Sequence, residues 1–165
     1  MMQHQELDYE IYYDCFDETA PDDATPLDYI KQASGGLPGE VVEWQEARER
    51  RSSSTRDIIH EEGDIWWYAT LAHKGLTSLE DANVMVKPRD VRASMLRTSA
   101  RLAGDLESLA FQKRVDKLGE ILCHLEDIFS LLYATPHDTR RVWAANLDKL
   151  DARYPDGFKP GGGQR

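Results

Sequence analysis

Apolar residues recur every three or four positions along most of the chain, which is the period of an amphipathic α-helix. The first stripe contains Leu7, Ile11 and Cys15, with Tyr12 and Phe16 beside it. No segment shows the sustained alternation of apolar and polar residues that indicates a β-strand. The pattern therefore predicts an all-α fold, a helical bundle.

Proline, glycine and capping residues mark where these helices are expected to begin and end. The expected helices cover residues 7–16, a short segment from residue 26, and residues 38–51, 55–73, 78–86, 88–111, 115–133 and 138–151. The run Gly35-Gly36-Leu37-Pro38-Gly39 is expected to break the chain. Gly75 is expected to stop a helix, and Ser78 to cap the next one. Lys87-Pro88 marks a boundary, and the glycine-rich residues 159–165 are expected to form a disordered tail.

A weak internal repeat is visible at a spacing of 63 to 65 residues. The matched positions are Asp64 with Asp127, Asn83 with Asn146, and Gly39 with Gly104. Two interpretations stay open, because helical sequences share a period by default: a duplicated helical unit, or chance. The chain is interpreted as a single domain over residues 1–158. If the duplication is real, residues 1–87 and 88–158 are two halves of a pseudo-dimer.

Charge and composition then limit the classes of partner. The 165 residues include 30 Asp and Glu against 20 Lys and Arg, for a formal net charge of −10. A nucleic-acid-binding surface is normally basic, so no nucleic-acid partner is expected. No apolar run approaches the ~18 residues of a membrane span, and residues 1–10 lack the features of a signal peptide. Cys15 and Cys123 are expected to be buried thiols in a cytoplasmic protein with no membrane partner.

Two pairs of acidic residues are spaced so that each pair lies on one helix face. Glu40 and Glu43 form the first pair, and Glu61 and Asp64 the second. Like charges at this spacing repel one another, unless a cation lies between them. Two such helices side by side would present four carboxylates to one point, which suits Mg²⁺ or Mn²⁺. The alternative is a solvated acidic face.

The surroundings of the second pair favour the metal site. Glu61 and Asp64 directly precede the strongly apolar run Ile65-Trp66-Trp67-Tyr68. Gly63 in the middle of a helix costs about 1 kcal/mol relative to alanine. A glycine at this position suits the close approach of a neighbouring helix, or room beside a ligand.

At these residues the chain resembles the MazG-like nucleoside triphosphate pyrophosphohydrolases of the all-α NTP pyrophosphatase superfamily. The family motif is E-x-x-E followed, after a gap, by E-x-x-D, and here 17 residues separate Glu43 from Glu61. Leu37-Pro38-Gly39-Glu40 and Glu62-Gly63-Asp64-Ile65-Trp66-Trp67-Tyr68 are similar to the family sequences around these two motifs. Residues 146–158 are similar to its closing motif, N-x-x-K-L-x-x-R-Y-P-x-G-F. The residues 16–20 are similar to its N-terminal helix.

The chain departs from the family pattern at two places. Glu62 stands where the family usually has leucine. The second half has also lost most of the acidic motif, if it is a copy of the first. The positions that would correspond to Glu40, Glu43, Glu61 and Asp64 are Asp105, Ser108, His124 and Asp127.

The resemblance implies metal-dependent hydrolysis of a nucleoside triphosphate to a monophosphate and pyrophosphate, by attack of water at the α-phosphorus. Glu40, Glu43, Glu61 and Asp64 would be the catalytic and metal-binding residues, with Mg²⁺ as the cofactor and Mn²⁺ as its alternative. Either Glu40 or Glu43 would orient or deprotonate the water.

The resemblance also implies residues that contact the substrate, and copies of the chain as partners. Lys149 and Arg153 would contact phosphates, and Asn146 a phosphate or the sugar; without the motif they would be surface residues. Trp66 is expected in the core, whereas Trp67 is expected either in the core or at a pocket that binds the base of the substrate. A homodimer or higher homo-oligomer is expected.

Three other assignments stay open as alternatives. They are a dUTPase, a phosphoribosyl-ATP pyrophosphohydrolase, and a non-catalytic helical protein that binds nucleotides or a partner. His60, His73 and His124 are expected to be ordinary helix residues, because an oxygen-rich metal site does not need them.

Overall fold

The computed structural model describes residues 8–19, 23–80 and 90–155, and within these ranges it contains helices and no strand. The prediction of an all-α fold is confirmed. The elements are α1 (Tyr9–Thr19), α2 (Pro26–Glu49), α3 (Thr55–Glu80), α4 (Met95–Gln112), the 3₁₀ turn η1 (Val115–Lys117), α5 (Leu118–Tyr133) and α6 (Thr139–Arg153).

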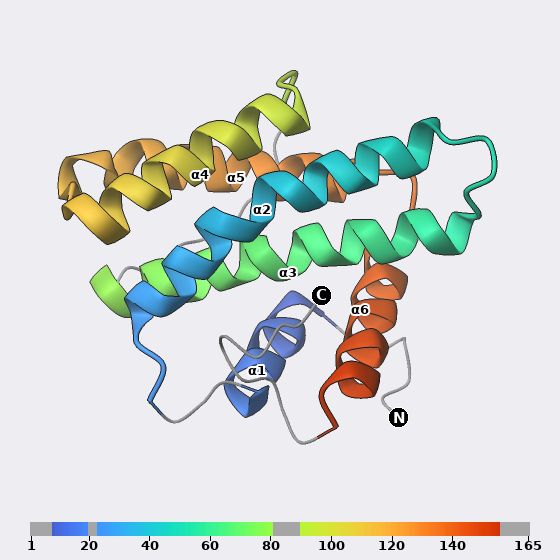
Figure 1. Ribbon diagram of the computed structural model, residues 1–165, viewed down its shortest axis with the longest axis horizontal. Helices are drawn as coiled ribbons and strands as arrows, with labels where there is room; N and C mark the ends of the chain where they lie inside the picture. The colour runs from blue at the N-terminus through green and yellow to red at the C-terminus, as the bar shows by residue number, and fades with distance from the viewer. Residues whose placement is uncertain (1–7, 20–22, 81–89, 156–165) are drawn as a thin grey trace.

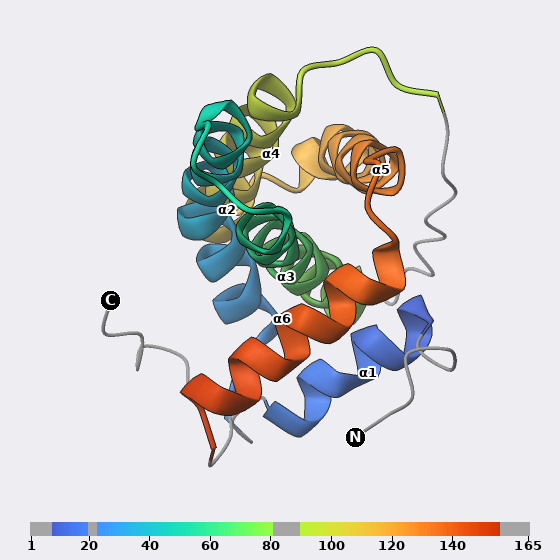
Figure 2. The ribbon, with the colours of Figure 1, turned by 90° about the vertical axis from the view of Figure 1, so that its right-hand side faces the viewer.

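The helices are arranged in three layers (Figures 1 and 2). The long helices α2 and α3 pack side by side in the middle layer, joined by the turn at residues 50–54. On one side of this pair lie α4 and α5, and on the other side lie α1 and α6. Helix α3 contacts helices of all three layers, which explains why its central part is apolar around most of its circumference.

Helix α2 is continuous from Pro26 to Glu49, so the expected break at residues 35–39 is wrong. A proline inside a helix costs about 3 kcal/mol, and Pro38 removes one backbone hydrogen bond. That cost is offset because the stripe of residues around it is buried, including Leu37 and Val41 at 0% exposure. Gly36 serves packing instead of a turn, since a Cβ there would lie 2.2 Å from the ring of Tyr68.

Helix α3 also continues past the residue expected to stop it. Gly75 is buried within α3, and a Cβ there would lie 2.7 Å from Ile30 and 2.8 Å from the carbonyl oxygen of Pro26. The glycine therefore lets the start of α2 approach α3 closely. Ser78, expected as an N-cap, lies inside α3, so this prediction is wrong. The rest of the helix expected at 78–86, and the boundary at 87–88, lie mostly or wholly outside the described residues.

The C-terminal helices are close to their predicted positions. Helix α4 begins at Met95 with Ser94 as its N-cap, later than the expected start at residue 88, and residues 90–94 are not helical. Helix α6 begins at Thr139, one residue after the expected start, with Asp138 as its N-cap. The predicted tail at 159–165 lies outside the described residues.

A cluster of aromatic rings fills the core between α3, α5 and α6. Trp66 is fully buried, which confirms its predicted place in the core. Its ring lies 5.4 Å from that of Phe129 and 5.1 Å from that of Trp143, centroid to centroid. Because edge and tilted contacts of this kind stabilise aromatic cores, the cluster fixes α6 against α3.

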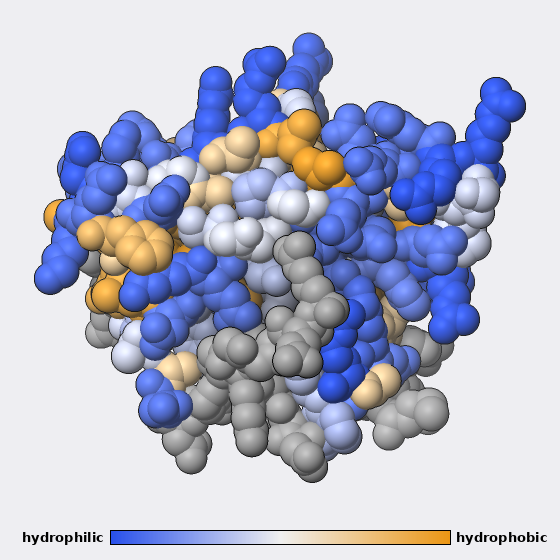
Figure 3. Space-filling view, in the orientation of Figure 1, coloured by the Kyte–Doolittle hydropathy of each residue, from blue (hydrophilic) through white to orange (hydrophobic). Residues whose placement is uncertain are grey.

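The face shown in Figure 3 is largely hydrophilic, with apolar residues in small areas only. The large apolar residues that are exposed in the described part of the chain are Val42, Leu79, Leu96, Phe111 and Val115. Cys15 is half-buried and Cys123 is exposed, so the prediction of two buried thiols is wrong. No helix in the described part of the chain is long and apolar enough to cross a membrane.

Candidate metal centre

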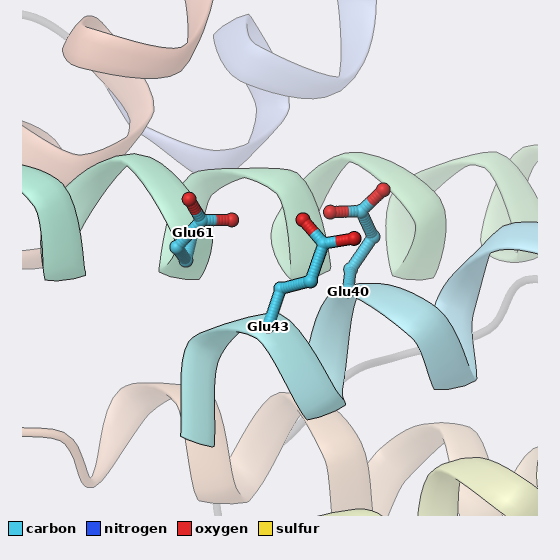
Figure 4. Close-up of side chains that lie close together, drawn as sticks. All are labelled: Glu40, Glu43 and Glu61. Atoms are coloured by element: carbon cyan, nitrogen blue, oxygen red, sulfur yellow. The ribbon is translucent and has the colours of Figure 1, made fainter. Parts of the chain in front are cut away.

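The acidic pairs predicted from the sequence meet where α2 and α3 pack against each other. Glu40 and Glu43 project from successive turns of α2 toward α3, and Glu61 projects from α3 beside them (Figure 4). One carboxylate oxygen from each of these three residues lies within 4.8 Å of the other two. The structure therefore brings three of the four predicted residues to one point.

The spacing of these oxygens is suitable for a small divalent cation. Ligands at about 2.1 Å from a Mg²⁺ ion lie at most about 4.2 Å apart, so only a small movement of the side chains would be needed. Oxygen donors are also the ligands that Mg²⁺ and Mn²⁺ prefer. The donor set consequently fits the group that the sequence implies.

Crowding of carboxylates makes this cluster electrostatically unfavourable without a cation. Burial raises the pKa of Glu40 to about 7, and the neighbouring Asp64, Glu43 and Glu61 contribute to the increase, while Lys149 lowers it. Burial and Asp64 likewise raise the pKa of Glu61, again opposed by Lys149. A bound divalent ion would remove this repulsion.

Asp64 lies beside the cluster but is held by α6. Its Oδ1 accepts a hydrogen bond from Nδ2 of Asn146 at 3.3 Å, and its Oδ2 accepts one from Nζ of Lys149. Asp64 is not a member of the three-carboxylate group. Its role as a metal ligand thus stays a prediction, whereas its contacts join the E-x-x-D motif to two residues of the C-terminal motif.

Asn146 is the residue that aligns α6 with α3. It is buried, and its Oδ1 accepts a hydrogen bond at 2.8 Å from the hydroxyl of Tyr12. A Cβ at Gly63 would lie 2.9 Å from the Cβ of Asn146. The mid-helix glycine therefore allows the close approach of a neighbouring helix, which is the first of the two uses expected for it. The amide of Asn146 positions Asp64, and its predicted contact with substrate stays a prediction.

The other two predicted substrate contacts are placed differently. Arg153 is exposed in the last turn of α6, one turn beyond Lys149 and on the same side of the helix. Trp67 is 6% exposed and stacks on Phe16 with the ring centroids 4.0 Å apart. Trp67 therefore belongs to the core like Trp66, and the substrate contacts expected for Trp67 and Arg153 stay predictions.

Sequence reasoning missed a buried polar cluster on another face of α3. Glu62 is 1% exposed; its Oε1 accepts a hydrogen bond from the hydroxyl of Thr135, and its Oε2 lies 2.8 Å from Nδ1 of His137. The cluster lies at the wall of a cavity of about 600 Å³ between α2, α3 and the ends of α4 and α5. The one signal in the sequence was the replacement of the family leucine by Glu62. Nothing marked its partners, more than 70 residues away.

The histidines in the described residues lie outside the three-carboxylate group. Nδ1 of His73 lies 2.6 Å from the hydroxyl of Tyr9, and the two rings stack. Nε2 of His124 lies 3.7 Å from Oδ2 of Asp105. These last two residues are the proposed counterparts of Glu61 and Glu40, so the second half pairs an acid with a histidine at the corresponding place. The duplication itself stays a prediction.

Comparison with protein-family models, with curated proteins and with solved structures gave no match. The resemblance to MazG-like enzymes consequently depends on the motif residues and on where the fold places them.

Proposed function

We propose that the protein is a metal-dependent nucleoside triphosphate pyrophosphohydrolase. The observation that carries this proposal is the meeting of two motifs far apart in the sequence. The three clustered carboxylates and Asp64 come from the E-x-x-E and E-x-x-D segments, and Lys149 and Asn146 of the closing motif bind that same Asp64. A chance match of loose patterns gives no reason for them to meet at one place.

In this proposal Glu40, Glu43 and Glu61 hold a Mg²⁺ ion, with Asp64 completing the acidic set. Bound there, the ion would neutralise the phosphates of the substrate and lower the pKa of a water molecule. The oxygen of a water held at the carboxylates would attack the α-phosphorus, the bond from that phosphorus to the bridging oxygen would break, and pyrophosphate would leave with that oxygen. Either Glu40 or Glu43, which lie on successive turns of α2, would orient the water or accept its proton.

The C-terminal helix would supply the positive charge that the acidic cluster lacks. Lys149 extends from α6 to Asp64 beside the cluster, and Arg153 follows one turn later on the same side of the helix. A triphosphate carries several negative charges, so it requires both the metal and these cations beside four carboxylates. The net charge of −10 does not oppose this function, since the local balance at the site decides binding.

A substrate panel tests the proposal directly. Pyrophosphate release is measured with Mg²⁺ and with Mn²⁺ for ribo- and deoxynucleoside triphosphates, including dUTP, for modified nucleotides and for phosphoribosyl-ATP. Glu61→Gln and Asp64→Asn should each lower the rate by about 100-fold or more, with the helical circular dichroism unchanged. Glu46→Gln is the matched control, because Glu46 lies on α2 one turn beyond Glu43 but is exposed and outside the cluster.

Three outcomes would decide between the alternatives. Activity confined to dUTP or to phosphoribosyl-ATP would assign the corresponding narrower enzyme. Full activity in both variants would show that the site is wrong. The absence of pyrophosphate release by the parent protein with every substrate would favour a non-catalytic nucleotide-binding or partner-binding protein.

A further inference from the structure

Both oxygens of Asp64 are occupied by side chains of α6. Asn146 donates to Oδ1 and the ammonium group of Lys149 donates to Oδ2. The side chains of Lys149 and Asp64 are only 25% and 18% exposed. Because both charges are largely withdrawn from water, their attraction is stronger than that of an ordinary surface ion pair.

The charge of Lys149 is also felt by the carboxylates that do not contact it. Lys149 lowers the pKa of Glu40 and of Glu61, against the combined effect of burial and the neighbouring acids. A divalent ion at the same place would have the same effect with twice the charge. In the metal-free protein, the ammonium group of Lys149 therefore acts on the cluster as a partial substitute for a divalent metal ion.

The two α6 residues on Asp64 differ in their freedom to move. Asn146 is buried, bonded to Tyr12 and packed against Gly63, so it is fixed together with the backbone of α6. Lys149 lies one turn further on, and its partly exposed four-carbon side chain can rotate away from Asp64 without any movement of the helix.

We propose that Lys149 is an exchangeable cation, which holds Asp64 in the metal-free protein and leaves it when a divalent ion binds to the carboxylates. The exchange avoids the repulsion between an ammonium group and a divalent ion on the same carboxylate. It also frees the ammonium group to bind a phosphate of the substrate only after the metal is in place. This inference rests on the proposed function, because it requires Asp64 to bind a divalent ion together with the three clustered carboxylates.

Binding of Mn²⁺ alone, without nucleotide, tests the exchange by calorimetry or by electron paramagnetic resonance. Lys149→Met should bind Mn²⁺ about tenfold more tightly than the parent, since the ion no longer displaces the ammonium group. Lys117→Met is the matched control, because Lys117 pairs with Glu120 at 3.2 Å on the surface and should change the Kd less than about twofold. In an Asp64→Asn background the effect of Lys149→Met should fall below about twofold.

A second measurement does not depend on a variant. In protein with ¹⁵N-labelled lysine side chains, the Nζ resonance of Lys149 should shift on addition of Mg²⁺, and that of Lys117 should not.

The possible results separate the exchange from its alternatives. Equal or weaker Mn²⁺ binding by Lys149→Met would overturn the exchange. So would an equal gain in the Asp64→Asn background, which would indicate repulsion at a distance, or an unmoved Lys149 resonance at saturating Mg²⁺. If the parent protein binds no Mn²⁺ at all, the proposed metal-dependent function is wrong, and the exchange is wrong with it.

Discussion

Replacement of Gly63 by alanine tests the packing on which the candidate site depends. The added Cβ would lie 2.9 Å from the Cβ of Asn146, closer than such carbon atoms approach in real structures. The Cβ of Asn146 is attached directly to the backbone of α6, so no rotation of a side chain can relieve this contact. Helix α6 itself must move away from α3, and Asn146 and Lys149 must move with it away from Asp64.

Two opposing effects determine how much Gly63→Ala changes the free energy of unfolding. Alanine in place of glycine inside a helix stabilises it by about 0.5–1 kcal/mol. An extra methyl group in a well-packed interior costs about 1–3 kcal/mol. Gly104→Ala isolates the first term, because Gly104 lies in α4, is exposed and has nothing within 4 Å of an added Cβ. Gly63→Ala should therefore be less stable than Gly104→Ala by about 1–3 kcal/mol.

Unfolding in urea and by heat measures this difference directly. In a chain of this size the melting temperatures of the two variants should differ by a few degrees to about ten degrees. Mn²⁺ binding and pyrophosphate release should also weaken in Gly63→Ala and stay at the parental level in Gly104→Ala. The reasoning is refuted if Gly63→Ala is as stable as Gly104→Ala, since α6 would then not be packed against Gly63 as described.

Three further predictions concern buried charge and protons. Glu62→Leu should lower the free energy of unfolding by about 1–3 kcal/mol, because His137 loses its contact with Glu62 and Thr135 keeps only its hydrogen bond to the carbonyl oxygen of Leu132. Equal stability in urea would contradict this. Glu40 has a higher pKa in the folded protein, about 7, than in the unfolded chain. Its contribution to the stability of the metal-free protein should therefore be greatest below pH 4.5 and should fall by about 1–2 kcal/mol as the pH rises through 7. The urea midpoints of the parent and Glu40→Gln should diverge between these two pH values. The increase in melting temperature caused by Mg²⁺ should grow from pH 6 to pH 8 as Glu40 loses its proton, and a gain independent of pH would count against Glu40 as a ligand.

The sequence was sufficient to predict the fold class, because helical periodicity is a local property. It was less reliable for residues 35–39 and for Gly75, which are expected to break or end a helix but lie inside α2 and α3. Gly36 and Gly75 instead allow close contact with Tyr68 and with the start of α2, whereas Gly63 allows the close approach of Asn146, as expected. Such contacts join residues far apart in the chain, so the local pattern around a glycine cannot distinguish a turn from a tight helix crossing.

At the candidate site, too, the sequence predicts the local arrangement but not the contacts between residues far apart in the chain. The i, i+3 spacing placed Glu40 with Glu43 correctly, and the pairing of α2 with α3 brought Glu61 to them. The separation of Asp64 from this group could not be predicted, because it depends on Asn146 and Lys149, more than 80 residues away.

The acidity of the chain acquires a different meaning once these positions are known. Most of the carboxylates in the described residues are exposed, but the four at α2 and α3 lie where burial raises the pKa of at least two of them. Carboxylates that repel one another in the metal-free protein are stabilised the most by a bound divalent ion. Such an ion would then attract phosphate more strongly than a lysine alone can. Lys149 reduces that cost in the metal-free protein and opposes the ion at the same time. Metal affinity at this site is therefore expected to be moderate, and the strongest binding should belong to the metal and the triphosphate together.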